Sequence, residues 1–229
     1  MHEGHRMRMK QKFLKEGLDA FESHEVLEML LYYIIPQKNT NELAHQLLES
    51  FGSFSAVLEA PVGSLTQFKG ISESGAVLIK MLPEVSRRYL EDKHGTDHMV
   101  VSSEDAGQIF LNKFVGRINE TVMLMLMDSK GKLLFCGVVN EGNMTSADIY
   151  IRKVVELGMR YNASVAILSH NHPSGVALPS HDDLVATREV KKALQLINIK
   201  LIDHIIVADD DFVSIAESNL GEDIFGDCK

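Results

Sequence analysis

Apolar residues in the first ninety positions recur every three or four residues, which is the spacing of one face of an α-helix. A stripe of this kind precedes Pro36 and is formed by Val26, Leu27, Leu30, Leu31 and Ile34. Another extends to about Leu90, and its inward face is expected to contain Ala76, Ile79 and Val85. Residues 1–90 are therefore predicted to form an all-helical domain.

Polar residues at the starts of these stripes predict where the helices begin. Asn39 and Glu42 have the spacing of a capping box. Ser53 and Ser72 precede further apolar stripes. Both are predicted N-caps, because a serine hydroxyl accepts a hydrogen bond from a free backbone N–H in the first helical turn.

Residues 91–98 contain no apolar side chain and are predicted to be a linker. Beyond them, short apolar runs typical of buried strands alternate with helical stripes. The runs 121–127 and 133–139 are joined by a Lys-Gly turn and predict a β-hairpin. Further strands are expected at 165–168, 201–207 and 212–215, and helices near 106–114, 147–158 and 186–197. Residues 99–229 are thus predicted to form a mixed α/β domain that ends in a polar tail from Glu217.

The composition is that of a globular protein, with 45% hydrophobic and 24% charged residues. The net charge of −9 disfavours bulk electrostatic binding to nucleic acid or to an anionic membrane. No apolar run reaches the roughly 20 residues of a membrane helix, and no signal-peptide core precedes Lys15. Cys136 and Cys228 are too few cysteines for a disulfide framework, so a cytoplasmic location is expected.

One basic cluster near the N-terminus contains Arg6, Arg8, Lys10, Lys12 and Lys15. It is expected to be a solvated, partly frayed terminus, because a run of like charges usually stays in solvent. Contact with nucleic acid is the alternative for this segment.

The residues with the most specific chemistry follow the predicted strand at 165–168. His170 and His172 are two apart, so extended backbone would direct both imidazoles to one face, where they can converge on Zn²⁺. Ser180 is a predicted N-cap, and a loop that doubles back would add the carboxylate of Asp183 from the first helical turn. Two imidazoles and one carboxylate leave a fourth position for water, which is typical of catalytic zinc.

The same residues also have a simpler interpretation. Pairs such as His170 and His172 are common near surface turns, and Asp183 has the spacing from Ser180 of a capping carboxylate at a helix N-terminus. Asn171 is expected to contact a substrate or to serve the turn. Residue spacing alone leaves both interpretations of this segment open.

The segment 170–183 resembles the JAMM motif of the MPN metalloprotease fold, in the form found in the bacterial RadC family. That form is His-x-His-Pro-Ser-Gly-x-x-x-Pro-Ser-x-x-Asp, and every specified position is matched. The resemblance extends to 201–207 and to the N-terminal helices, so it spans nearly the whole chain. It implies an MPN/JAMM-like α+β domain, with a mixed sheet and flanking helices, in residues 99–229.

The resemblance also implies a role for each matching residue. His170, His172 and Asp183 would hold one zinc ion per chain. Ser180 would hydrogen-bond near the water at the metal and help to stabilise the oxyanion. Glu120 opens an apolar run at the position where the family carries its general base. It would take a proton from that water and return it to the leaving amine.

Other residues have more than one interpretation. Glu141 and Glu156 are the alternative carboxylates for the general base. Where RadC proteins usually have Pro-Arg-Glu, this chain has Ile-Arg-Lys at 151–153, which leaves the role of that helix open. Asp203 and His204 are expected either to support the ligands as a pair or to be satisfied core residues.

Residues 65–77 resemble a helix-hairpin-helix turn, which presents backbone N–H groups and a helix N-terminus to a DNA phosphate. Gly70 and Ile71 match the turn, Ser72 stands where a second glycine is usual, and Lys69 is the nearby cation. DNA binding through these four residues is one expectation. Docking of a partner, or of a second copy in a homo-oligomer, is the other.

Taken together, these features favour zinc-dependent hydrolysis of an amide or isopeptide bond in a peptide or protein substrate that the sequence does not identify. The alternative is a DNA-associated or partner-binding protein whose metal site is not catalytic. No membrane partner is expected, because the chain lacks an apolar span.

Overall fold

The computed structural model describes the chain except for residues 1, 37–38, 95–98, 143–146, 174 and 227–229. The chain divides into two compact units, Met1–Ser86 and Arg87–Lys229. Among the described residues, no helix has both the length and the apolar character needed to cross a membrane.

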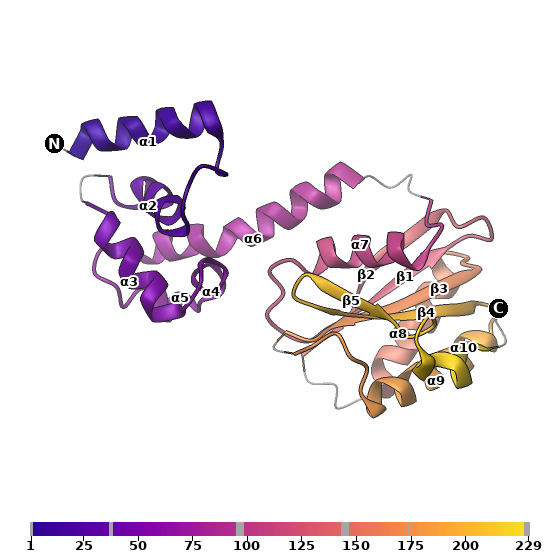
Figure 1. Cartoon of the computed structure of the whole chain (residues 1–229). Coiled ribbons are helices and arrows are strands. Elements are labelled where there is room, and N and C mark those ends of the chain that lie inside the picture. The colour runs from indigo at the N-terminus through magenta and orange to yellow at the C-terminus, as the bar shows by residue number, and fades with distance from the viewer. Residues whose placement is uncertain (1, 37–38, 95–98, 143–146, 174, 227–229) are drawn as a thin grey trace. The chain divides into compact units, whose positions relative to one another are not determined.

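The first unit is helical, and its elements are labelled in Figure 1. The elements are α1 (His2–Glu16), α2 (Ser23–Ile34), α3 (Asn41–Phe51), α4 (Phe54–Glu59), α5 (Val62–Leu65) and α6 (Glu73–His94). Apolar residues from α2 to α6 form one core, in which Leu27, Leu31 and Leu47 are fully buried. The helices that the sequence predicts in this region are therefore present.

The predicted capping box at Asn39 and Glu42 is wrong. Helix α3 begins at Asn41, with Thr40 as its N-cap, and the Asn39 side chain accepts a hydrogen bond from the Asn41 N–H instead (3.1 Å). The Thr40 hydroxyl donates to the Glu28 carbonyl of α2 (3.3 Å). The first turn of α3 is therefore joined to α2 by a hydrogen bond. The spacing of residues within α3 does not predict this contact with another helix.

The basic N-terminal cluster is not a frayed terminus, because it lies on α1, which packs against α2 through the buried Met9. Arg6 donates to the Ile35 carbonyl (2.8 Å) beyond the end of α2, where backbone carbonyls lack helical partners. Lys12 pairs with Glu25 (3.3 Å). The hydrophobic pattern misses this helix because polar pairs supply much of its contact with α2.

Helix α6 does not end near Leu90 as predicted. It continues through residues 91–94, so this part of the expected linker is helical, and the remainder, 95–98, lies outside the described residues. Glu91 forms an ion pair with Lys113 (3.2 Å). The next two residues of this last turn, Asp92 and Lys93, are exposed, where charged side chains are well suited.

The inward face of α6 is only partly as predicted. Ala76 and Ile79 are fully buried, whereas Val85 is 53% exposed. The first compact unit ends at Ser86, so α6 has reached the edge of that core at Val85. At the other end of the helix, the Ser72 hydroxyl accepts a hydrogen bond from a first-turn N–H (3.2 Å), as predicted.

The second unit is built on a mixed five-stranded sheet with the order β2-β1-β3-β4-β5. The strands are β1 (Thr121–Met127), β2 (Leu133–Glu141), β3 (Val165–Asn171), β4 (Lys200–Ala208) and β5 (Asp211–Ser214). Strands β3 and β4 are parallel and the other neighbours are antiparallel, including the predicted β1–β2 hairpin. The mixed α/β architecture expected for this half of the chain is therefore present.

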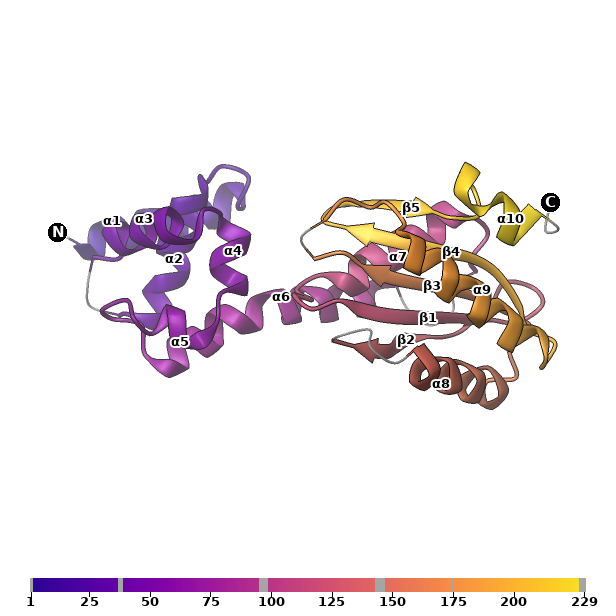
Figure 2. The ribbon, with the colours of Figure 1, turned by 90° about the horizontal axis from the view of Figure 1, so that it is seen from below.

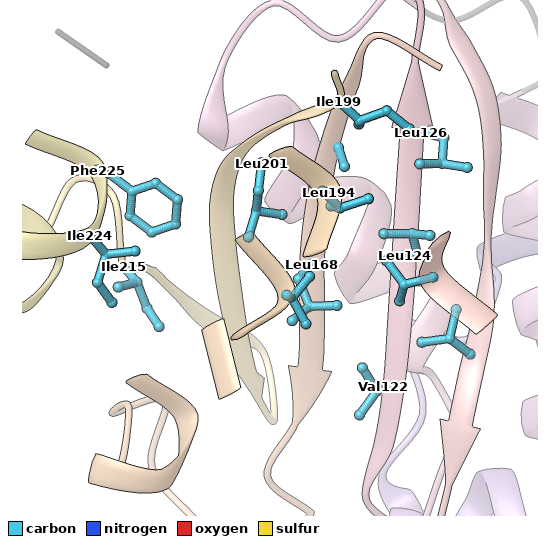
Figure 3. Close-up of a cluster of buried hydrophobic side chains, with 14 of the residues drawn as sticks. Val122, Leu124, Leu126, Leu168, Leu194, Ile199, Leu201, Ile215, Ile224 and Phe225 are labelled. Atoms are coloured by element: carbon cyan, nitrogen blue, oxygen red, sulfur yellow. The ribbon is translucent and has the colours of Figure 1, made fainter. Parts of the chain in front are cut away.

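Helices cover both faces of the sheet (Figures 1 and 2). Helix α7 (Ser103–Phe114) packs on one face, and α8 (Ala147–Arg160), α9 (His181–Gln195) and α10 (Glu222–Phe225) pack on the other. Alternate residues of β1 belong to the two cores: Val122, Leu124 and Leu126 lie on the α9 face, shown in Figure 3, and Met123, Met125 and Met127 face α7. All of β1 is buried for this reason.

The polar tail predicted from Glu217 is wrong for residues 219–225, which form a short 3-10 helix and α10. Ile224 and Phe225 are buried in the core on the α9 face (Figure 3). The Lys191 ammonium donates to the Ile224 carbonyl and lies 5.5 Å from the centre of the Phe225 ring. Two apolar residues in a polar stretch are too short a pattern to predict this docking.

One buried hydroxyl in the sheet lacks a partner: among the described residues, Ser169 Oγ is the buried side-chain polar atom without a hydrogen bond. Ser169 pairs with Ile205 of β4, which pairs with Ser214 of β5. Ser214 is satisfied, because its hydroxyl donates to Asp203 (2.6 Å).

Ser169→Ala is therefore expected to raise the free energy of unfolding by about 1 kcal/mol, because it removes a buried donor that no group satisfies. Ser214→Ala, in the same row of the sheet, is the matched control and should lower it by about 1–3 kcal/mol. Urea denaturation measures both values. A Ser169→Ala protein destabilised as much as the control would contradict the assignment.

Candidate metal centre

The JAMM-like motif lies where β3 ends and α9 begins. Strands β3 and β4 are parallel and α9 connects them, and side chains at the carboxyl ends of such strands commonly build sites in α/β folds. His170 is the last residue but one of β3. The His172 N–H donates to the Val207 carbonyl (2.8 Å), so extended pairing continues one residue beyond the strand. Both imidazoles therefore share one face, as the sequence predicts.

Asp183 returns to this face from α9 and completes a compact cluster. The Nε2 atoms of His170 and His172 are 2.9 Å apart. The Asp183 carboxylate oxygens lie 3.1 Å from the first Nε2 and 3.7 Å from the second. Ligand atoms about 2.0–2.1 Å from a tetrahedral ion are separated by about 3.3 Å, which falls within this set of distances.

A capping box holds the Asp183 carboxylate in place. The Ser180 hydroxyl accepts from the Asp183 N–H (3.2 Å) and donates to Asp183 Oδ2 (2.6 Å), and the Ser180 N–H donates to the same oxygen (2.7 Å). Oδ1 is the oxygen nearest His170. The simpler interpretation of Asp183 as a capping residue is thus correct, and it is compatible with a ligand role because Oδ1, the oxygen nearest His170, takes no part in the capping box.

The cluster is buried except at His172, whose side chain reaches the surface. His170 is 1% exposed and Asp183 is 4% exposed, whereas the His172 side chain is 21% exposed. Burial alone would raise the pKa of Asp183. The hydrogen bond and charge interaction with His170 and the two hydrogen bonds from Ser180 outweigh burial and hold this pKa well below its usual range. The carboxylate is therefore ionised and suited to a cation.

The outer nitrogen of His172 has its own partner, because Nδ1–H donates to the Val176 carbonyl (3.0 Å). A carbonyl can only accept, so the proton of the neutral ring is on Nδ1 and the Nε2 lone pair faces the cluster. Two imidazole nitrogens and a carboxylate that converge in this way fit a divalent cation, and zinc accepts such a donor set.

The expectation that Asp203 and His204 act as a pair is wrong, and the alternative, that they are satisfied core residues, is confirmed, because both are buried and hydrogen-bonded. The two residues lie within β4 and face opposite sides of the sheet. Asp203 accepts from Ser214 on the α7 side, and burial raises its pKa. His204 Nε2 lies 2.9 Å from His170 Nδ1, and burial holds its pKa well below the usual range. Thr187 of α9 contacts the other His204 nitrogen (2.6 Å) and was not predicted as a site residue.

Glu120 immediately precedes β1, at the strand end that pairs with His170. Val122 of β1 pairs with His170, and Glu120, two residues earlier, would share the face of Val122 if the extended alternation continued beyond the strand. Its side chain is partly buried, and its carbonyl accepts from the Gly142 N–H (2.9 Å). The structure gives no hydrogen bond or ion pair that occupies this carboxylate among the described residues.

The segment that carries Glu120 is fixed by Asn171, the residue between the two histidines. The Asn171 amide donates to the carbonyls of Arg117 (3.3 Å) and Asn119 (3.2 Å). Its side-chain oxygen accepts from the Thr121 N–H (2.8 Å). All the polar atoms of this buried side chain are thus engaged with the backbone on either side of Glu120, which accounts for Asn171 without a substrate contact.

The alternative carboxylates are occupied elsewhere. Glu141, opposite Thr121 at the end of β2, forms an ion pair with Arg117 (3.6 Å) and its side chain is half exposed. Glu156 pairs with Arg152 on the exposed surface of α8 (2.9 Å). The unusual Ile-Arg-Lys sequence therefore contributes Arg152 to a surface ion pair.

The four residues predicted to bind DNA lie between α5 and α6. Gly70 has a φ of +113°, which favours glycine, and Ile71 is buried in the core of the first unit. Ser72 caps α6, and Lys69 is exposed. This geometry forms a tight turn before a helix, and DNA binding by Lys69 and its neighbours stays a prediction.

The fold and the site together define a class of protein: a mixed α/β domain with a His-His-Asp cluster at the end of a strand. A model of the family described as "RadC-like JAB domain" matches residues 100–220. The UPF0758 protein of Photobacterium profundum is 33% identical over 210 residues, which cover 92% of this chain and 94% of that protein.

Two further relatives show the same extent of similarity. The UPF0758 proteins of Tolumonas auensis and of Chromobacterium violaceum are each 33% identical over 211 residues, covering 92% of this chain and 94% of each relative. The chain belongs to the RadC-like JAB domain family, so the resemblance found in its motif is confirmed.

Proposed function

We propose that this protein is a zinc-dependent hydrolase that cleaves an amide or isopeptide bond in a peptide or protein. The observation that carries the proposal is the convergence of His170 Nε2, His172 Nε2 and the Asp183 carboxylate, which lie within 4.8 Å of one another. Partial exposure of the His172 side chain in an otherwise buried cluster is compatible with a metal that must also contact a substrate.

His170, His172 and Asp183 would hold the ion. Borderline nitrogen donors combined with one carboxylate suit zinc better than magnesium or calcium, which prefer oxygen ligands. When bound, a zinc ion supplies Lewis-acid chemistry, which makes water more acidic and polarises a substrate carbonyl.

Two residues around the ion would transfer protons and stabilise charge during the reaction. In hydrolysis, the water oxygen bonds to the carbonyl carbon and the C–N bond breaks. Glu120 is proposed to accept a proton from that water and to return it to the leaving nitrogen. Ser180 is proposed to stabilise the negative charge that develops on the carbonyl oxygen, although its hydroxyl donates to Asp183 in this structure.

A metal-removal experiment tests this function. The purified protein is analysed for bound metal and then screened for cleavage of a peptide library before chelation, after chelation and after zinc is restored. Cleavage is expected before chelation, is expected to disappear after it, and should return with zinc but not with magnesium.

A His172→Ala protein, purified in parallel, controls for contaminating peptidases and should cleave nothing. Cleavage that persists after complete metal removal, or that is equal in the His172→Ala protein, would contradict the proposed function.

A further inference from the structure

A buried hydrogen-bonded chain lies behind His170, on the side away from the other two proposed ligands. His170 Nδ1 is 2.9 Å from His204 Nε2. His204 Nδ1 is 2.6 Å from Thr187 Oγ1, and that hydroxyl is 2.5 Å from the Asp183 carbonyl oxygen. Thr187, His204 and His170 are each at most 2% exposed, so the chain makes its hydrogen bonds with protein groups.

The direction of these hydrogen bonds follows from proton counting. The Asp183 carbonyl can only accept, so the single Thr187 hydroxyl proton lies between these two oxygens. Thr187 Oγ1 must then accept from His204 Nδ1–H. A neutral imidazole carries one N–H, which leaves His204 Nε2 as an acceptor for His170 Nδ1–H.

These hydrogen-bond directions determine where the protons of His170 lie, and therefore whether the nitrogen that faces the cluster can have a free lone pair. The hydrogen-bonded chain fixes a proton on His170 Nδ1, so in the neutral ring the lone pair is on Nε2, which faces His172 and Asp183. Since His172 is held in the same tautomer by the Val176 carbonyl, two lone pairs and a carboxylate face one another. Between neutral rings no donor proton separates these atoms, so the arrangement becomes favourable when a cation is bound or when His170 Nε2 takes up a further proton, which Asp183 would then accept as a hydrogen bond.

We infer that Thr187 and His204 are positioning residues that hold His170 in its metal-binding tautomer and orientation. The inference rests on the proposed function, in which His170 is a zinc ligand. Thr187 is one helical turn after Asp183 and donates to its backbone carbonyl. The Asp183 carbonyl thus orients the Thr187 hydroxyl, which orients His204, which in turn fixes the tautomer of His170.

The test is the zinc affinity of variants, measured by competition with a chromophoric chelator. Thr187→Val keeps the side-chain shape but cannot accept from His204, and its zinc affinity is expected to fall by about 10–100-fold. Thr187→Ser restores the hydroxyl and should bind zinc within about threefold of the natural protein. Ser214→Ala, which removes a buried hydroxyl from the other face of the sheet, is the matched control and should leave the affinity unchanged.

A second measurement needs no variant. The histidine ¹⁵N–¹H spectrum of the zinc-free protein distinguishes protonated from unprotonated ring nitrogens, and the proton of His170 is expected on Nδ1. A proton on Nε2 of neutral His170, or equal zinc affinity for Thr187→Val and Thr187→Ser, would overturn the inference. A natural protein that binds no zinc would instead overturn the proposed function, so the two failures are distinguishable.

Discussion

Asp183→Asn is expected to weaken zinc binding by more than about 100-fold, because the substitution replaces an anionic ligand with a neutral amide. Loss of residues that only support a ligand typically costs about 10–100-fold, and loss of a ligand should cost more. The asparagine side-chain oxygen can still accept from the Ser180 N–H, so the start of α9 is expected to survive. Equilibrium dialysis against zinc measures the loss, and circular dichroism checks the fold.

The neighbouring residue offers a control of the same chemistry. Asp182 is also in the first turn of α9, but it is exposed and outside the cluster. Asp182→Asn removes the same charge from the same helix end and should bind zinc as the natural protein does. Tight zinc binding by the Asp183→Asn protein would remove Asp183 from the ligand set.

The second large effect is expected for Glu120→Gln, which should reduce the rate of peptide cleavage by about 10²–10⁴-fold. A glutamine has the shape of glutamate but cannot accept the proton that hydrolysis releases. Zinc affinity should stay within about twofold of the natural protein, because Glu120 is outside the metal cluster. The measurements are the cleavage rate of a peptide found in the library screen and the zinc content of the same sample.

Glu141→Gln is the discriminating control for this prediction. Glu141 and Glu120 both lie at the site end of the β1–β2 hairpin, but Glu141 is paired with Arg117. Its substitution should leave cleavage within a few-fold of the natural rate, since Glu141 is half exposed, already paired and outside the metal cluster. A large loss in Glu141→Gln with none in Glu120→Gln would transfer the general-base role to Glu141.

Much of the second unit could be predicted because its elements have strong local patterns. Both faces of β1 are covered, so Thr121–Met127 is a continuous apolar run bounded by polar residues, and the hairpin turn is marked by Lys-Gly. The His-x-His spacing predicts a shared face because side chains alternate along a strand, and Ser180 has the position of an N-cap.

The elements that escaped prediction depend on contacts between distant residues. Helix α1 docks through Arg6 and Lys12, whose charges suggest solvent rather than a partner helix. Helix α10 is anchored by Ile224 and Phe225 in a polar stretch, and the start of α3 coincides with a hydrogen bond from Thr40 to α2. A hydrophobic pattern indicates which face of one element is buried, but it does not indicate which polar group hydrogen-bonds to which distant carbonyl.

The candidate site likewise contains residues that a local motif predicts and residues that only contacts between distant segments bring together. The three proposed ligands are found from a motif in one short segment. His204 lies 34 residues from His170 and 17 from Thr187, so their contacts follow from the β3–β4 register and the path of α9. Asp203 and His204 are adjacent in sequence, yet the pleat of β4 separates them onto opposite faces, where one supports Ser214 and the other supports His170.

Locating the bound ion would test directly whether His170, His172 and Asp183 hold a metal. Crystals of the protein grown with zinc would be measured at wavelengths just above and just below the zinc absorption edge. One strong anomalous peak per chain is expected, within about 2.0–2.2 Å of His170 Nε2, His172 Nε2 and an oxygen of Asp183. Well-ordered density for all three side chains with no anomalous peak between them would contradict the assignment of these ligands.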